Sequence, residues 1–182
     1  MRIAQLLLPS LFVVILSSSA SATVLLPADF TEVVTGSSTI VFGRVVEVRS
    51  TLSGPRRVIE SFVTVSVIQS LKGAAGATVT FRVPNGQVGR YRRVLVGAPE
   101  FAAGDEVVVF LQGRAPAVPS VFGLSQGVYR VTRDAGAGAL VVPPVTGRGA
   151  RAERVVRGDP VRRPMPVEAF AREVRAVLER AR

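Results

Sequence analysis

The sequence predicts a mainly β fold: a small β-barrel, closed or partly open, with one short helix before it and one helix after it. Two observations favour this fold. About seven short segments rich in β-branched residues follow one another between residues 39 and 142, and glycine- and proline-rich turns separate them. No helical crossover lies between them, which excludes a doubly wound sheet. Strands of this number are typical of a barrel or a sandwich, and we favour the barrel.

Residues 1–22 have the features of a cleavable signal peptide. Arg2 provides the positive start, residues 3–16 are mostly apolar, and Ala20 and Ala22 occupy the small-residue positions before the cut. A helix of about 14 residues is about 21 Å long, which is shorter than the roughly 30 Å hydrocarbon core of a bilayer. We therefore expect an exported protein, periplasmic or secreted, without a membrane span after cleavage. An uncleaved membrane anchor is the alternative.

A short helix is predicted over residues 27–36. Asp29 is a suitable N-cap, and Glu32 follows three residues later, as in a capping box. Gly36 is expected to end the helix in the left-handed conformation. The apolar residues that share one face, and that should pack on the barrel, are Phe30, Val33 and Val34.

The barrel domain is predicted to span residues 23–142. Its expected strands are 39–49, 58–71, 78–83, 91–96, 106–112, 127–132 and 139–142. Apolar and polar residues alternate cleanly over 78–83, which indicates one buried and one exposed face. The nearly continuous apolar run at 106–112 predicts a central strand that is covered on both faces. The last two strands should form a hairpin.

The C-terminal part of the chain changes in character after the predicted barrel. Residues 143–165 are rich in proline, glycine and arginine, and we predict a flexible linker. Residues 166–182 predict an amphipathic helix. It either docks on the barrel or attaches to a partner or a membrane surface. Its apolar stripe consists of Val167, Phe170, Val174, Val177 and Leu178.

The chain contains neither histidine nor cysteine, so zinc and copper sites lack their usual ligands. Residues Gly123 to Gly127 match the G-x-S-x-G pattern of hydrolases, but Ser125 has no histidine to act as its base. We interpret this segment as a turn between strands. Ser70 and Lys72 could in principle form a serine–lysine catalytic pair. They are better explained as the end of a strand with a solvated lysine. The sequence therefore predicts a protein that is not an enzyme and that holds no cofactor or metal.

The charge is strongly positive, with 23 Lys and Arg residues against 13 Asp and Glu, a net charge of +10. It favours an anionic surface or an acidic partner, or it reflects genomic codon usage alone. Nucleic acid is an unlikely partner for an exported protein. Another motif, at residues 90–93, could bind sulfate, phosphate or carboxylate groups. The candidate binding residues are Arg90, Tyr91, Arg92 and Arg93.

The geometry of a strand argues against a single patch at residues 90–93. Alternation would place Arg90 and Arg92 on the face opposite to Tyr91 and Arg93. The alternative interpretation is a solvated edge strand that its charges protect from mispairing.

Four segments, residues 39–48, 65–73, 97–101 and 104–111, resemble in their order a widespread group of uncharacterised exported bacterial domains. More distantly, they resemble the netrin-like OB-fold domain of the tissue inhibitors of metalloproteinases. The resemblance covers roughly residues 28–132 and implies an OB-like barrel. In those inhibitors an N-terminal cysteine chelates the zinc of the protease. This chain has no cysteine, so that mechanism does not carry over.

These observations together predict an exported, non-enzymatic domain that binds a protein partner or an anionic component of the cell envelope. One alternative is an inhibitor or accessory protein of an exported metalloprotease or other hydrolase. Another alternative is an enzyme of unrecognised type.

Overall fold

The computed structural model describes residues 28–114, 116–134, 138–144 and 163–181. The predicted signal peptide and most of the predicted linker lie outside these residues. The described helices are α1 (Phe30–Gly36), the 3₁₀ helix η1 (Leu124–Gly127) and α2 (Val167–Arg180). The described strands are β1 (Thr39–Ser53), β2 (Val58–Lys72), β3 (Thr78–Val83), β4 (Gly86–Val88), β5 (Tyr91–Arg93), β6 (Glu106–Gln112), β7 (Ser120–Val121), β8 (Val128–Asp134), β9 (Gly138–Val142) and β10 (Met165–Pro166).

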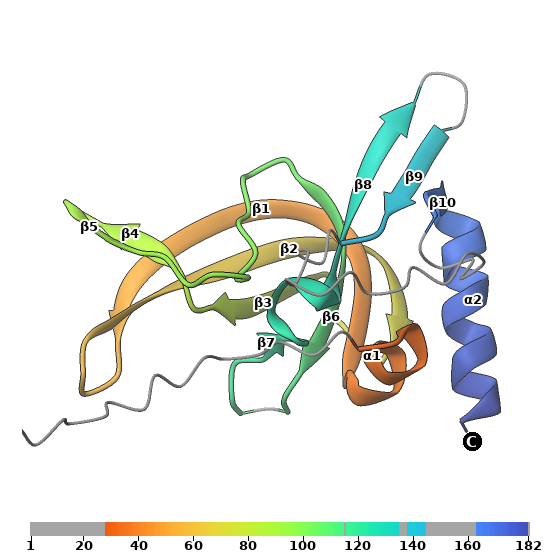
Figure 1. Ribbon diagram of the computed structural model, residues 1–182, viewed down its shortest axis with the longest axis horizontal. Helices are drawn as coiled ribbons and strands as arrows, with labels where there is room; N and C mark the ends of the chain where they lie inside the picture. Colours follow the sequence, from red (N-terminus) through yellow and green to blue (C-terminus); the bar gives the residue numbers. More distant parts are fainter. Residues whose placement is uncertain (1–27, 115, 135–137, 145–162, 182) are drawn as a thin grey trace, which may run out of the picture.

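Within the described residues, five strands close a barrel in the order β1-β2-β3-β7-β6 (Figure 1). The barrel closes because β6 pairs with β1 as well as with β7. The pairings are antiparallel except for the short parallel contact of β3 with β7. Strands β8, β9 and β10 extend the sheet outward from β6. The predicted mainly β barrel is confirmed, and it is closed.

Strand β6 is covered on both faces, as its apolar run predicted. Val107, Val109 and Leu111 belong to an apolar cluster inside the barrel, which we call the barrel core. Val108 and Phe110 point the other way, into a cluster beneath the helices, which we call the helix core. This alternation follows from the two-residue repeat of a strand, and it makes β6 the wall that the two cores share.

Helix α1 begins as predicted, because the Asp29 carboxylate accepts a hydrogen bond of 2.7 Å from the amide of Glu32. The expectation for Gly36 is wrong, since it belongs to the helix and has no positive φ. A Cβ atom at Gly36 would lie 2.6 Å from the ring of Phe122. The glycine is therefore needed for a close approach and not for a left-handed turn.

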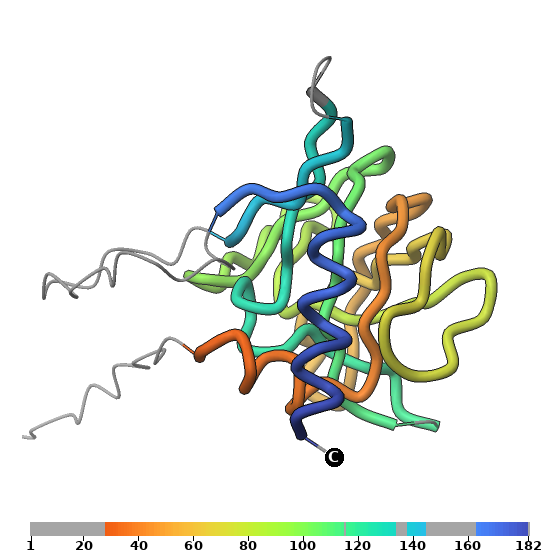
Figure 2. The backbone as a smooth tube through the Cα atoms, turned by 90° about the vertical axis from the view of Figure 1, so that its right-hand side faces the viewer, coloured from red at the N-terminus to blue at the C-terminus, as the bar shows by residue number. Residues whose placement is uncertain are grey.

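Helix α2 docks on the sheet beside α1 (Figure 2), so the docking interpretation is confirmed. Phe170 is 1 % exposed, and its ring centroid lies 5.5 Å from that of Phe30 and 5.0 Å from that of Tyr129. Strand β10 immediately precedes α2 and pairs with β9 through Met165 and Val141. Met165, the last residue of the predicted linker, therefore belongs to the sheet.

The predicted strand at 91–96 differs from the structure, where β5 ends at Arg93. Strand β5 pairs with β4 in a separate two-stranded hairpin. Residues 94–96 continue as a loop. A strand needs a partner for its backbone groups, and the three-residue β4 is too short to pair beyond Arg93. Strands β4 and β7 and the helix η1 are features that the sequence patterns did not indicate.

Candidate functional site

A hollow of about 730 Å³ opens beside the turn that joins β1 to β2. We call it the arginine hollow. Strands β2, β3 and β5, the β1–β2 turn and the loop before β7 all contribute to its lining. The lining residues on which its chemistry depends are Arg56, Glu60, Phe62, Arg82, Arg93 and Val118.

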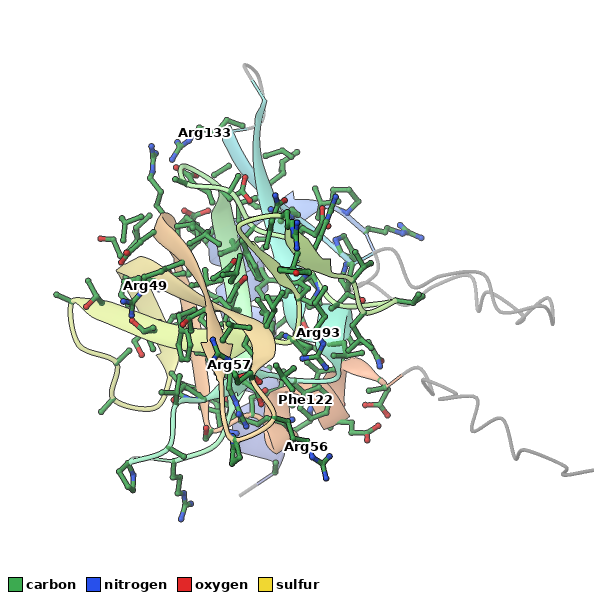
Figure 3. The ribbon with its side chains drawn as sticks, turned by 90° about the vertical axis from the view of Figure 1, so that its left-hand side faces the viewer. Arg49, Arg56, Arg57, Arg93, Phe122 and Arg133 are labelled. Carbon is green, nitrogen blue, oxygen red and sulfur yellow. The ribbon has the colours of Figure 1, made fainter. Side chains whose placement is uncertain are left out.

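Strand alternation places Glu60 and Phe62 on the outer face of β2, because Ile59, Ser61 and Val63 point inward and are buried. Phe62 stands opposite Arg82 of β3 and opposite Arg49 of β1 in the strand register. An aromatic side chain thus lies in a row between two guanidinium groups. Figure 3 shows Arg56 and Arg93 near the same end of the β1–β2 hairpin.

The hollow has an excess of positive charge. Among its described lining residues, three are arginines and one, Glu60, is acidic. The Glu60 carboxylate lies 3.8 Å from a guanidinium nitrogen of Arg82, so it offsets part of that charge. Arg93 donates a 3.2 Å hydrogen bond to the carbonyl of Ile59, which holds its side chain over β2. Guanidinium groups bind phosphate and carboxylate through paired N–H donors, so the hollow is suited to an anionic group.

The β1–β2 turn that presents Arg56 has a constrained backbone. Arg57 adopts a left-handed φ of 49°, which is uncommon for a residue other than glycine. Its amide donates a 3.1 Å hydrogen bond to the carbonyl of Gly54. Local strain of this kind persists where the surrounding structure holds it in place, so the turn that carries Arg56 has a defined backbone path.

The structure does not bring the four candidate residues of the sequence into one cluster. Arg90 donates a 2.9 Å hydrogen bond to the Tyr91 hydroxyl and lies 5.1 Å from the centre of its ring. Arg92 forms an ion pair of 2.9 Å with Glu100. Of the four, Arg93 reaches the arginine hollow.

Sequence reasoning missed Arg56 and Arg82 as members of the site. The alternation of β3 already indicated that Arg82 points outward. No local signal indicated that the β1–β2 turn lies beside β3 and β5, because that proximity comes from the pairing of β2 with β3 and the packing of β5 against β2.

A second charged cluster surrounds Glu106, which is 8 % exposed. Its carboxylate accepts hydrogen bonds from Arg133 at 2.8 and 3.0 Å and from Arg44 at 2.5 Å. The hydrogen bond from Arg133, followed by that from Arg44, holds the pKa of Glu106 below its ordinary value against the opposing effect of burial. A carboxylate held ionised between two guanidinium groups is a poor general acid, so the cluster ties β1 and β8 to β6.

The G-x-S-x-G segment is a turn, as interpreted from the sequence. It contains η1, and strand β8 follows directly, so the strand–turn–helix context of a nucleophile elbow is missing. Gln126 is buried, and its side-chain oxygen accepts a 2.6 Å hydrogen bond from the amide of Ala28. The segment therefore fastens the start of α1 to the barrel.

Lys72 ends β2, as expected, but its half-exposed side chain is also held by the protein. Its ammonium donates hydrogen bonds of 2.8 and 3.0 Å to the carbonyls of Val34 and Thr35, at the C-terminal end of α1. These carbonyls have no partner within the helix, and a cation there is favoured by the helix dipole. Partial burial lowers the pKa of Lys72 below its usual value. Ser70 donates instead to the carbonyl of Gly73, so Ser70 and Lys72 serve the structure.

Two further observations concern the described part of the chain. Neither of its α-helices is long and apolar enough to cross a membrane. Across the same residues, no group of three or more His, Cys, Asp or Glu side chains is placed to hold a metal ion.

Comparison of the chain with protein-family models, with curated proteins and with solved structures finds no match. The resemblance to exported bacterial domains and to netrin-like domains therefore stays a prediction.

Proposed function

We propose that this chain is an exported, non-enzymatic domain that binds an anionic component of the cell envelope through the arginine hollow. The ligand carries phosphate or carboxylate groups. The observation that carries this proposal is the convergence of Arg56, Arg82 and Arg93, from three separate elements, on one hollow of about 730 Å³.

The surroundings of the three arginines support a binding role. Arg82 stands on a strand of the closed barrel, whose hydrogen-bonded wall limits its movement, and the Arg93 side chain is held over β2 by its hydrogen bond to the carbonyl of Ile59. A rigid arrangement of donors loses less conformational entropy on binding than a mobile one. Phe62 and Val118 add apolar surface beside the charges, which suits a ligand that combines an anionic group with an apolar or ring-shaped part.

The acidic and nucleophilic groups support a role without catalysis. Glu106 is engaged by two arginines, and Asp105 forms an ion pair with Arg130. Ser125 lies in a turn of a chain that contains no histidine. The carboxylates of Glu106 and Asp105 are therefore already paired with arginines, which suits a binding domain better than a site of proton transfer.

The test is calorimetric titration of the mature protein, residues 23–182, with inorganic polyphosphate, and in parallel with polyaspartate as the carboxylate probe. The variant Arg56→Gln/Arg82→Gln/Arg93→Gln should bind at least about tenfold more weakly, because it loses three charge-assisted donors. The affinity of the parent protein should fall as salt rises.

The matched control is Arg172→Gln/Arg175→Gln/Arg180→Gln, which removes the same charge from the exposed side of α2. It should bind nearly as well as the parent protein. Equal loss in both triple variants would mean that net charge, and not the arginine hollow, attracts the anion.

A further inference from the structure

Three consecutive apolar side chains project from the loop after β5. Val94 is 66 % exposed, Leu95 39 % and Val96 92 %. Single exposed apolar residues are common on protein surfaces, whereas a contiguous group indicates contact with something else. We call residues 94–96 the apolar loop.

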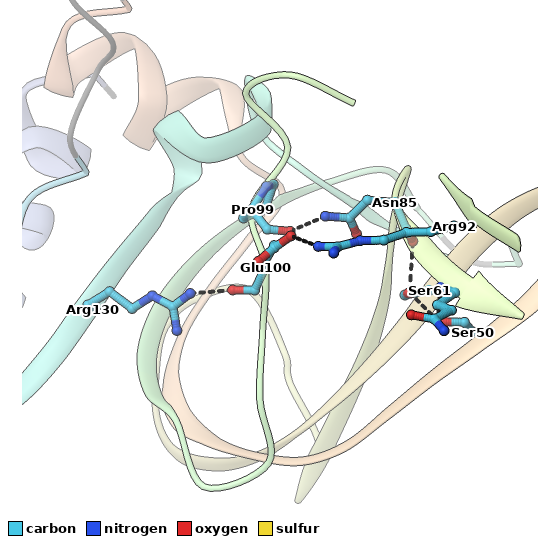
Figure 4. Close-up of polar contacts among 8 residues, drawn as sticks. Ser50, Ser61, Asn85, Arg92, Pro99, Glu100 and Arg130 are labelled. Carbon is cyan, nitrogen blue, oxygen red and sulfur yellow. Dashed lines mark hydrogen bonds and ion pairs between the residues drawn. The ribbon is translucent and has the colours of Figure 1, made fainter. Parts of the chain in front are cut away.

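The apolar loop is held at its base by fixed contacts (Figure 4). Asn85 donates a 2.8 Å hydrogen bond from its side-chain amide to the carbonyl of Pro99. The amide of Ala98 donates to the carbonyl of Leu95 at 3.0 Å. A loop fastened in this way presents its apolar side chains to the solvent with a smaller entropy loss on binding than a mobile loop has.

Positive charges predominate in the sequence around the apolar loop. Residues 86–98 contain Arg90, Arg92 and Arg93 and no acidic residue. Outside this stretch, Glu100 pairs with Arg92, but both side chains are largely exposed, so that pair is weak. Tyr91 is 62 % exposed beneath the guanidinium of Arg90. Aliphatic side chains bordered by arginines and a tyrosine are the composition of a protein surface that meets an anionic bilayer.

The small size of the apolar loop favours a lipid surface over a protein partner. A specific protein interface buries about 800 Å² on each side, and its core is enriched in aromatic residues and methionine. Three aliphatic side chains supply neither the area nor the composition. A bilayer needs no matching shape, and a shallow insertion together with nearby positive charge is sufficient for reversible attachment.

We propose that the apolar loop inserts into the surface of an anionic lipid bilayer, with Arg90, Arg92 and Arg93 at the level of the headgroups. This inference rests on the proposed function and names lipid headgroups as the source of the anion. Arg93 links the two features, because it directly precedes the apolar loop and also lines the arginine hollow. Each basic residue near such a surface contributes roughly fivefold to partitioning, so attachment should be reversible and salt-dependent.

The chain contains no tryptophan, so Val96→Trp introduces a single fluorescent reporter. Vesicles that contain phosphatidylglycerol should shift its emission to the blue, and lipids brominated in their acyl chains should quench it. The control Ile68→Trp places the reporter at a site on β2 that is 55 % exposed, and its emission should not change. An unchanged Val96→Trp spectrum, or equal changes at both sites, overturns the proposal.

A second variant separates this inference from the proposed function. Val94→Ser/Leu95→Ser/Val96→Ser should co-sediment with anionic vesicles at least about tenfold less than the parent protein, because it loses its apolar contact. Its binding of inorganic polyphosphate should equal that of the parent, since the three arginines of the hollow are untouched. Undiminished co-sedimentation overturns the membrane inference. Absence of both polyphosphate and polyaspartate binding by the parent protein would instead contradict the proposed function.

Discussion

The barrel core and the helix core share strands β1, β6 and β8 but are built from different side chains. The buried members of the barrel core are mostly valines, and Phe81 is the aromatic residue among those described. The helix core gathers the rings of Phe110, Tyr129 and Phe170, and Phe30 packs against them in edge-to-face contacts. Neighbouring residues of one strand therefore meet two different packing environments.

The difference reflects how each core is enclosed. A five-stranded barrel is narrow, and small β-branched side chains fill it well. A Cβ atom at Gly43 would overlap the backbone carbonyl of Ser66 on the neighbouring strand β2, at a register shift of the β1–β2 pairing. The helix core is covered by α1 and by α2, which arrives from the far end of the chain. The barrel core is closed by hydrogen-bonded strands, whereas the helix core depends on docking.

The largest effect is expected from removing α2 by ending the chain at residue 162. The truncation removes the buried apolar contacts of four side chains, Val167, Phe170, Val174 and Val177. At about 1.5–3 kcal/mol each, the loss is about 6–12 kcal/mol, which is comparable to the whole stability of a typical domain. The truncated chain should show no cooperative urea transition and should bind a hydrophobic dye. A cooperative transition with a parent-like midpoint would show that the helix core is dispensable.

A matched pair of substitutions compares the two cores directly. Phe81→Ala and Phe170→Ala each remove one fully buried ring. The cost of such a cavity depends on how far its surroundings can relax. We expect Phe81→Ala to lower the free energy of unfolding by about 4–5 kcal/mol, because the barrel wall is held by hydrogen bonds. Phe170→Ala should cost about 3 kcal/mol, because α2 can shift toward the gap. Urea denaturation measures both values, and the reverse order would contradict this account of enclosure.

The smallest effect on stability is expected at Glu106, the first residue of β6, which is the strand that the two cores share. Its pKa is lowered from the ordinary value of 4.5 in the folded state, first by the hydrogen bond from Arg133. Its contribution to stability is therefore fully present above pH 4.5 and is lost as the pH falls through the lower folded-state pKa. Glu106→Gln should reduce the free energy of unfolding by about 1–2 kcal/mol at neutral pH.

The same variant should lose less stability than the parent protein when both are acidified, so the two curves should converge at low pH. The control Glu179→Gln, at an exposed position on α2, should change stability by less than about 0.5 kcal/mol. Parallel pH curves for the parent protein and Glu106→Gln would show that the ion pairs do not stabilise the wall.

Several elements could be predicted because their signals are local. The continuous apolar run of residues 106–112 indicated a strand covered on both faces, and β6 is such a strand. The spacing of Asp29 and Glu32 indicated the N-terminus of α1, and the hydrogen bond between them confirms it. The stripe of residues 167–178 indicated a helix with one apolar face, and that face lies in the helix core. In each case adjacent residues carry the whole pattern.

Other features depend on segments that are distant in sequence. Gly36 is required by Phe122, and Lys72 binds the end of a helix that lies 37 residues earlier. Strand β5 ends at Arg93, where its pairing with Gly86 of β4 ends.

The sequence by itself indicated most of the element types, the direction in which the side chains of β3 and β6 point and the absence of the usual catalytic and metal-binding side chains. Composition and the two-residue repeat contain that information. The tertiary structure alone decided which outward-pointing residues meet. Arg56, Arg82 and Arg93 share one hollow because β3 pairs with β2 and Arg93 of β5 reaches across to β2, beside the β1–β2 turn. Arg90 and Arg92, although next to Arg93 in the chain, are bound to Tyr91 and Glu100 instead. Strand pairing decides which residues of different strands lie side by side, and no local sequence pattern encodes that pairing.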